Sequence, residues 1–194
     1  MNLRPKPFLA VAMLAFAVVS TPALSQDDSG WFIGGTGGVS DAKQGCTAVS
    51  AGVTCDDTST GWRAFGGYRF NPYLGYEIGY ADLGKVTQTL AGASATFEST
   101  AIDVVLFAAL PIGQDFSFFI KGGVFRWDLD LKSPGAATTS SHGQDTTYGF
   151  GLHYNFTRNF ALRLEWQRYN DVGNVDITGQ SHIEVTSAGL VLKF

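Results

Sequence analysis

Residues 147–156 read Thr-Tyr-Gly-Phe-Gly-Leu-His-Tyr-Asn-Phe, and this stretch decides the fold. Every second residue from Tyr148 to Phe156 is large and apolar, while the residues between them are glycine or polar. Successive side chains of a β-strand point to opposite sides, so a period of two predicts a strand with one apolar face.

Seven further segments show the same alternation. In each, one face is bulky and apolar, while the other carries small or charged side chains. The segments are 31–41, 62–70, 73–83, 102–110, 118–125, 160–167 and 187–194. The charged residues of the second face are Arg63, Arg69, Glu77, Asp103, Lys121, Arg163, Glu165 and Lys193.

The polar face distinguishes a membrane barrel from a soluble sheet. In a soluble sandwich it would meet water, yet here it is rich in glycine, which weakens exposed strands. Small residues lining a concave interior would leave room for charged side chains to meet. Aromatic residues also gather near the segment ends, as in the interfacial girdles of outer-membrane barrels.

The connections between segments alternate in length. Three are short, and four are longer and polar, which is the arrangement of outer-membrane barrels with an even strand count. The short ones are 71–72, 111–115 and 157–159, and the longer ones are roughly 42–59, 84–95, 132–145 and 171–182. We therefore predict an all-β fold, an eight-stranded antiparallel up-and-down transmembrane β-barrel. Eight strands enclose a space that side chains nearly fill, which predicts a packed, salt-bridged lumen.

The composition and the N-terminus agree with an exported membrane protein. The 194 residues include 13 Lys+Arg and 17 Asp+Glu, with 45% hydrophobic and only 15% charged residues, which argues against disorder and nucleic-acid binding. Arg4 and Lys6 precede the apolar run 8–19, and Ala23-Leu24-Ser25 offers a cleavage site. We predict a Sec-type signal peptide over 1–25, rather than a short membrane anchor, followed by a barrel domain over 26–194.

Cys46 and Cys55 lie in the first long connection, where a disulfide would close a ten-residue loop. The alternatives are two free thiols or part of a metal site. No histidine lies in that connection, and zinc requires four ligands, so we predict the disulfide.

Catalytic groupings are weak in this sequence. His142 and His182 follow serines in the long connections, but neighbours in sequence rarely assemble a catalytic triad. His153 belongs to the lumen face, where we expect it to be a hydrogen-bond partner. The carboxylates of the lumen face could form acid–base machinery, but Arg63, Lys121 and Arg163 can neutralise them, and buried charges must be paired. We predict a structural ion network, no enzyme activity, no cofactor and no metal.

Five motifs, in this order along the chain, resemble the OmpA-like transmembrane domain, a family of small eight-stranded outer-membrane barrels. They are Trp31-Phe32-Ile33-Gly34-Gly35, Gly66-Gly67-Tyr68-Arg69-Phe70-Asn71, Glu77-Ile78-Gly79-Tyr80, Arg163-Leu164-Glu165-Trp166, and the final Ala188, Leu190, Leu192 and Phe194. The resemblance covers nearly all of residues 30–194. One family member continues into a peptidoglycan-binding domain, so cell-wall tethering is not carried over.

The resemblance implies a location, partners and roles for several residues. It implies that Glu77, Asp103, Lys121, Arg163 and Glu165 form a polar plug, and that the four long connections face the cell exterior. Phe194, Leu192 and Leu190 resemble the signal that the outer-membrane assembly machinery reads. We expect a monomer in the outer membrane, in contact with lipid and lipopolysaccharide, with structural and surface-display roles such as adhesion. The alternatives are a narrow pore, a lipid A-modifying enzyme and a soluble lipocalin-like barrel. The His-x-Ser-Asn pattern of the lipid A deacylases is absent from this sequence.

Overall fold

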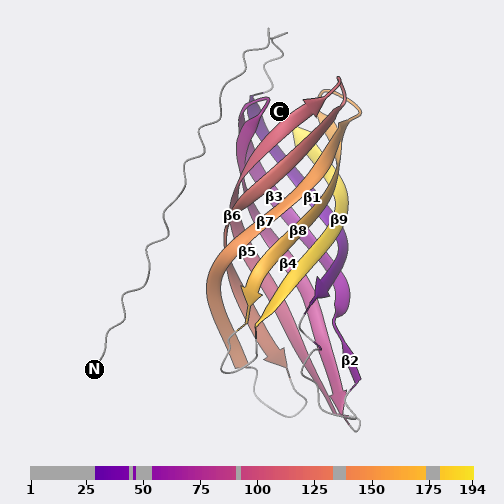
Figure 1. Cartoon of the computed structure of the whole chain (residues 1–194), viewed down its shortest axis with the longest axis vertical. Coiled ribbons are helices and arrows are strands. Elements are labelled where there is room, and N and C mark those ends of the chain that lie inside the picture. The colour runs from indigo at the N-terminus through magenta and orange to yellow at the C-terminus, as the bar shows by residue number, and fades with distance from the viewer. Residues whose placement is uncertain (1–28, 44–45, 47–53, 91–92, 133–138, 174–179) are drawn as a thin grey trace, which may run out of the picture.

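A computed structural model describes residues 29–43, 46, 54–90, 93–132, 139–173 and 180–194. The signal-peptide prediction lies outside these described residues. The described part contains nine strands that form a tall cylinder (Figure 1). They are β1 (Gly30–Ala42), β2 (Thr54–Asp56), β3 (Thr58–Asn71), β4 (Leu74–Leu90), β5 (Ala93–Ile112), β6 (Phe116–Lys132), β7 (Thr139–Asn155), β8 (Phe160–Val172) and β9 (Ser181–Lys193).

Eight of the strands close into an antiparallel barrel, which confirms the predicted fold class. Each pairs with its neighbours along the chain, and β1 pairs with β9 from Phe32–Lys193 to Ala42–Ile183, which closes the wall. The exception is the three-residue strand β2, which pairs only with residues 87–89 of β4. No helix within the described residues is long and apolar enough to cross a membrane.

The wall has its apolar side chains outside and its charged side chains inside, as predicted. Ile78, Leu106, Ile120 and Leu164 are among the outward-facing residues, and all are exposed. Aromatic side chains mark both borders of this apolar band, with Trp62 against Tyr80 and Tyr148 against Trp166 on the side of the long connections. On the side of the short turns the aromatic pairs are Trp31–Tyr68, Tyr68–Phe70, Phe116–Tyr154 and Phe156–Phe160.

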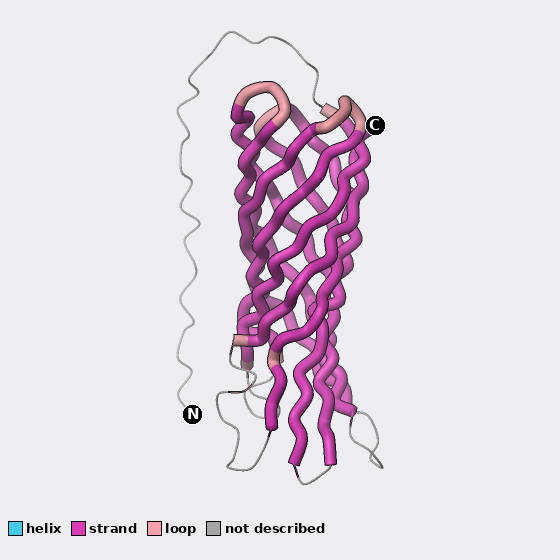
Figure 2. The backbone as a smooth tube through the Cα atoms, turned by 90° about the vertical axis from the view of Figure 1, so that its right-hand side faces the viewer, coloured by secondary structure: helices cyan, strands magenta, loops and turns pink. Residues whose placement is uncertain are grey.

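The long connections are shorter than we predicted. Much of 84–95 and 132–145 continues the strands β4 to β7, while 42–59 includes β2 and the start of β3, and 171–182 includes the end of β8 and the start of β9. We call the strand extensions 83–90, 93–100, 126–132 and 139–146 the collar. Figure 2 shows these strands running on toward the end opposite the short turns. Polar outward residues such as Arg126 and Asp128 made this region look like loop.

The interior is layered rather than uniformly polar. Charged side chains occupy the middle of the lumen, and an apolar cluster lies on each side of them. The cluster toward the turns contains Phe32, Phe65, Phe107, Ala109, Phe119, Ala161 and Val191. The cluster toward the collar contains Ala42, Ala81, Leu83, Ala101, Phe125, Trp127, Leu129, Tyr169, Val172, Ile183 and Val185.

Candidate functional site

The candidate site is the ion network in the middle of the lumen. Alternation on five strands turns its members inward: Arg63 on β3, Glu77 on β4, Asp103 on β5, Lys121 on β6, and both Arg163 and Glu165 on β8. Each of the six is at most 5% exposed. Three cations and three anions therefore share one sealed space, with no net charge.

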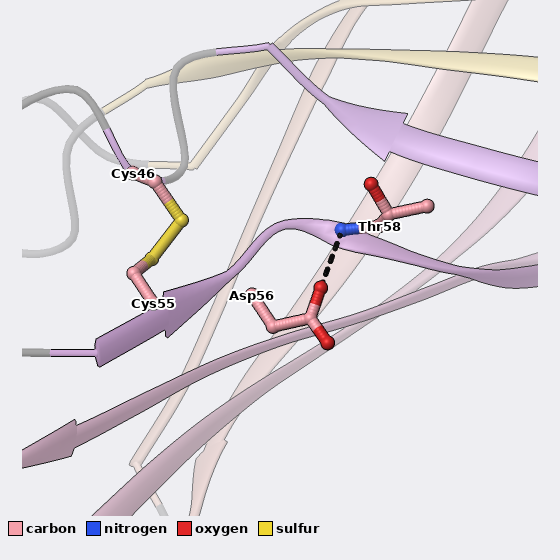
Figure 3. The surroundings of a disulfide bond; sticks show 4 residues. All are labelled: Cys46, Cys55, Asp56 and Thr58. Carbon is pink, nitrogen blue, oxygen red and sulfur yellow. Dashed lines mark hydrogen bonds between the residues drawn. A yellow bond between two sulfur atoms is a disulfide. The ribbon is translucent and has the colours of Figure 1, made fainter.

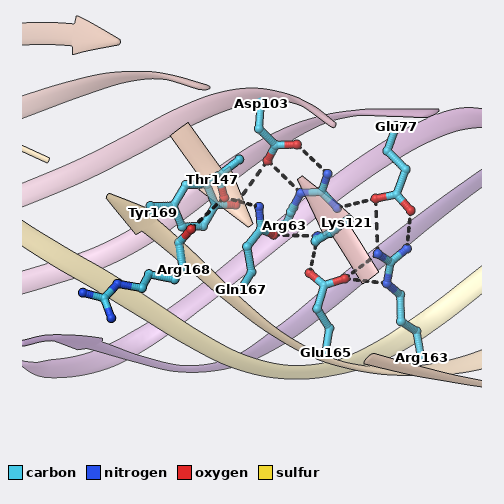
Figure 4. Close-up of polar contacts among 10 residues, drawn as sticks. All are labelled: Arg63, Glu77, Asp103, Lys121, Thr147, Arg163, Glu165, Gln167, Arg168 and Tyr169. Carbon is cyan, nitrogen blue, oxygen red and sulfur yellow. Dashed lines mark hydrogen bonds and ion pairs between the residues drawn. The ribbon is translucent and has the colours of Figure 1, made fainter. Parts of the chain in front are cut away.

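The six side chains form a chain of alternating sign across the lumen (Figure 4). Arg63 donates to both oxygens of Asp103 at 2.8 and 2.5 Å and to Glu77 at 3.0 Å. Arg163 donates to Glu77 at 2.6 and 3.2 Å, and its Nε donates to Glu165 at 2.6 Å. Lys121 ends the chain with a bond of 2.7 Å to Glu165.

Three polar side chains extend the network toward the collar. Lys121 donates to Gln167 Oε1 at 2.7 Å, and Gln167 Nε2 donates to Thr147 Oγ1 at 2.9 Å. The Tyr169 hydroxyl donates to Asp103 at 3.1 Å. We had not assigned these residues to the site. Gln167 and Tyr169 continue the inward positions Arg163 and Glu165 on β8, so the period of two carried the signal.

Aromatic rings seal the network on the side of the turns. The Arg163 guanidinium lies 4.6 Å from the Phe65 ring centroid and 4.4 Å from that of Phe119, and Arg63 lies 4.8 Å from that of Phe65. Such cation–π contacts stabilise the cations where water is excluded. Two cavities lined by lumen residues measure only about 10 Å³ each, close to the smallest space for one water. The arrangement is suited to bracing the barrel.

Glycines on the lumen face make room for these large side chains. A Cβ at Gly79 would lie 2.6 Å from Arg63 Nε and 2.7 Å from its Cζ, so the network needs glycine at this position. The rings of Phe107 and Phe119 occupy the corresponding spaces at Gly75 and Gly151.

We expect Gly79→Ala to destabilise the barrel by about 1–3 kcal/mol, because the new methyl group displaces a guanidinium that two carboxylates hold in place. Urea titration of the protein folded in lipid vesicles measures this loss. Gly37→Ala is the matched control, because a Cβ there comes no closer than 3.9 Å to any atom. Equal stability of the two variants would contradict the tight fit at Gly79.

His153 faces the lumen but stands apart from the ion network. Its ring stacks on Phe119 with centroids 4.6 Å apart, and neither ring nitrogen has a hydrogen-bond partner. The expected hydrogen bond is therefore absent, because the ring lies in the apolar layer near the turns. Within the described residues, no three His, Cys, Asp or Glu side chains are grouped to hold a metal ion.

Cys46 and Cys55 form the predicted disulfide (Figure 3), with Cα atoms 5.7 Å apart. Cys55 lies at the centre of β2, where it pairs with Gln88 of β4. Asp56 accepts a hydrogen bond from the Thr58 backbone amide at 3.2 Å, which turns the chain into β3. The disulfide therefore fastens the first long connection beside the collar.

Reduction of this disulfide is expected to loosen the β2 region alone. The bond closes a short loop, while the eight strands of the wall pair independently of it. Amide hydrogen exchange should rise at 54–56 after reduction and stay unchanged at 102–110 of β5. A Cys46→Ser/Cys55→Ser variant serves as the reference without reductant. Faster exchange throughout the barrel would contradict a local role.

The residues that resemble an assembly signal lie at the end of β9 and directly after it, beside the seam that closes the barrel. Leu190 and Phe194 point outward and are exposed, and the Phe194 amide donates to the Trp31 carbonyl at 3.0 Å. Leu192 pairs with Ile33 of β1 and Phe160 of β8. Their recognition by the assembly machinery stays a prediction.

Comparisons with known proteins agree with this architecture. The family model of the OmpA-like transmembrane domain matches residues 26–194. Outer membrane protein A of Salmonella typhi is 31% identical over 175 residues, which cover 88% of this chain and 49% of that protein. The chain thus spans about half the length of this relative.

Two solved structures share the fold at low sequence identity. Neisserial surface protein A superposes with a TM-score of 0.67 at 16% identity, covering 86% of this chain and 98% of that chain. Ail, the attachment invasion locus protein of Yersinia pestis, solved with the heparin analogue sucrose octasulfate, superposes with a TM-score of 0.53 at 14% identity. That match covers 86% of this chain and 97% of Ail.

Proposed function

The chain belongs to the family of OmpA-like transmembrane domains, and from this membership we propose that it is a non-conducting barrel that supports the outer membrane and displays its collar to partners at the cell surface. Family membership makes it an integral protein of the outer membrane. We propose no catalytic role. The proposed orientation places the collar outside the cell and the short turns in the periplasm.

The filled lumen carries the non-conducting part of the proposal. An ion that crosses must pass between Arg63, Glu77 and Arg163, which are joined by hydrogen bonds of 2.6–3.2 Å. It must also pass the apolar layers on both sides of the network, where nonpolar side chains replace most of the water that solvates an ion. Each obstacle opposes conduction, and together they favour a supporting role over the narrow pore.

Single-channel recording in planar bilayers tests this point. We expect no steady conductance from the folded protein. A positive control is Phe65→Ala/Phe119→Ala, which removes the two rings that seal the network on the side of the turns. Steady openings of the unmodified protein, at a frequency proportional to the protein added, would support the pore instead.

The charge of the collar end points to the kind of surface partner. Carboxylates outnumber cations among the described residues beyond the apolar band. The carboxylates are Asp41, Asp56, Asp57, Asp82, Glu98, Asp128, Asp130, Asp145, Asp171 and Glu184, and the cations are Lys43, Lys85, Arg126, Lys132 and Arg168. Such a surface repels polyanions, such as the heparin analogue with which Ail was solved, and attracts cationic segments.

The edge of β7 offers a place for such a segment. β7 pairs with β6 as far as Thr139, but its pairing with β8 begins only at Thr147. Among the described residues, no strand pairs with the other edge of 139–146. An extended peptide can add to an open edge through main-chain hydrogen bonds, and nearby Asp128 and Asp145 favour basic side chains on it.

Binding of a fluorescent polylysine peptide to vesicles that contain the protein tests the surface role. We expect Asp128→Asn/Asp130→Asn to weaken this binding, because it removes two outward carboxylates of the collar. Asp115→Asn is the matched control, since Asp115 is an exposed carboxylate in a short turn. Polyglutamate should not bind. Equal polylysine binding by all three proteins would count against the collar as the contact surface.

A further inference from the structure

A basic pocket opens at the turn end of the barrel. It has a volume of about 100 Å³, and three of its eight lining residues are cationic. Arg69 lies two residues before the end of β3, Lys193 ends β9, and Arg158 lies in the turn between β7 and β8. The remaining lining residues are Ser29, Gly30, Trp31, Asn159 and Phe194.

Pairing of the strands brings the cations together. Gly30 of β1 pairs with Arg69, and Phe32 of β1 pairs with Lys193, so both side chains flank the start of β1. The Arg69 guanidinium lies over the Phe107 ring at 5.5 Å. Lys193 Nζ donates to Asn155 Oδ1 at 2.6 Å, and Asn159 Nδ2 donates to the Lys193 carbonyl at 3.0 Å. The first two contacts orient the Arg69 and Lys193 side chains, while the Arg158 side chain is exposed beside them.

A second observation points to a polar ligand at this end. Arg69 and Lys193 also line a smaller cavity of about 10 Å³ on the inner side of the pocket, and His153 forms part of its wall. His153 is only 5% exposed, and both its ring nitrogens lack a hydrogen-bond partner. Buried polar groups are normally satisfied, so this ring is placed to bond a water or a ligand atom that reaches the inner cavity.

The other wall of the pocket belongs to the membrane border. Trp31 and Phe194 both line it, yet these side chains are 60% and 69% exposed on the outside of the barrel. A ligand in the pocket therefore touches cations on one side and the aromatic girdle on the other. A lipid whose phosphate enters the pocket could keep its acyl chains in the apolar band.

We propose that Arg69, Arg158 and Lys193 bind the headgroup phosphate of an anionic phospholipid in the periplasmic leaflet. Guanidinium groups match the oxygens of a phosphate in charge and geometry, and basic pockets at membrane borders attract anionic headgroups. The volume of about 100 Å³ is several times the space that one water needs by the same measure, so the pocket has room for one phosphate group. The leaflet, but not the site itself, rests on the orientation given above.

Quenching of Trp31 by brominated lipids tests the proposal directly. In a Trp62→Phe/Trp166→Phe background, Trp31 is the tryptophan that faces lipid, because Trp127 is buried inside the barrel. The protein is folded in vesicles that contain brominated phosphatidylglycerol or brominated phosphatidylcholine at equal mole fraction. Both leaflets carry the probe, so the result does not depend on how the protein inserts.

We expect phosphatidylglycerol to associate beside Trp31 at least about fivefold more strongly than phosphatidylcholine, and Arg158→Gln to reduce this preference about fivefold. Arg158 is exposed, so the change leaves the wall intact. Arg126→Gln removes an exposed cation at the collar end and should keep the preference. No preference, or a preference that Arg158→Gln leaves unchanged, overturns the proposal.

Inorganic phosphate tests whether the pocket binds the phosphate of a lipid headgroup or a free phosphate ion. Sodium phosphate should displace the brominated phosphatidylglycerol only weakly compared with sodium chloride of equal ionic strength, because it lacks the acyl chains. A preference for phosphatidylglycerol that millimolar phosphate abolishes, while sodium chloride of equal ionic strength does not, would assign the pocket to a free oxyanion and overturn the lipid assignment. These readouts are independent of conductance and polylysine binding, so this proposal and the proposed function can fail separately.

Discussion

Glu77→Gln is expected to lower the free energy of unfolding by about 3–5 kcal/mol, although it keeps the size of the side chain. Glu77 accepts hydrogen bonds from both Arg63 and Arg163. Without its charge, three cations face two carboxylates inside a space that aromatic rings seal from water. Urea titration of the protein in lipid vesicles, followed by tryptophan fluorescence, measures the loss.

Two further variants separate this effect from a general response to charge. Asp128→Asn removes an exposed carboxylate of the collar and should change stability by no more than about 0.5 kcal/mol. Lys121→Met, combined with Glu77→Gln, restores equal numbers of cations and anions, so we expect the double variant to lose less stability than the two single losses combined. Additive losses would mean that the balance of charge within the lumen is unimportant.

Leu164→Arg is expected to destabilise the barrel by about 2–4 kcal/mol, the range for a cation on the lipid face near the bilayer midplane. Leu164 is 48% exposed on β8, and its neighbours across the strands are Leu152 and Ala188. Arginine at this position takes a charge into the acyl chains. The same titration in vesicles measures the effect.

Gln144→Arg is the matched control for this change. Gln144 also points outward, but it lies in the collar beyond the apolar band, so we expect a loss of only about 0–1 kcal/mol. Equal losses at the two positions would show that the apolar wall does not face acyl chains at Leu164.

The strands of the apolar band were predictable because the alternating side chains of each strand indicate which of its faces turns toward lipid. In 147–156 and 160–167, the period of two shows which side chains share a face, and the chemistry of the faces shows which one meets lipid. Closure of β1 on β9 follows because an open edge has no partner in lipid. The disulfide between Cys46 and Cys55 was likewise predictable, because their connection holds no histidine to complete a metal site.

The collar was not predicted because, along the strand, the apolar side chains change from the outward face to the inward face. Up to Val124 on β6 the outward residues are apolar, but from Arg126 onward they are polar, and the apolar residues Trp127 and Leu129 turn inward. A strand that leaves lipid for water must exchange the chemistry of its two faces. Residues 125–132 keep a strict period of two, so the strand continues past this change.

The partners within the lumen were beyond the reach of the sequence for a different reason. Inward orientation identifies the members of the network, but not which carboxylate meets which cation. Glu77 and Arg163 are 86 residues apart, and their contact depends on the stagger of all strands between them. The same holds for His153, whose position above Phe119 rather than beside the ions depends on its height along the barrel axis.

The contact between Glu77 on β4 and Arg163 on β8 has a mechanical consequence. Hydrogen bonds within the wall resist sliding of neighbouring strands, but they do little to keep a hollow tube round when it is squeezed from the side. A tie between strands that are not neighbours resists flattening, as a crossbar stiffens a hoop. The barrel therefore keeps the shape of its cross-section under the lateral pressure of the surrounding bilayer. Its stiffness comes from the ion network inside the barrel rather than from the wall.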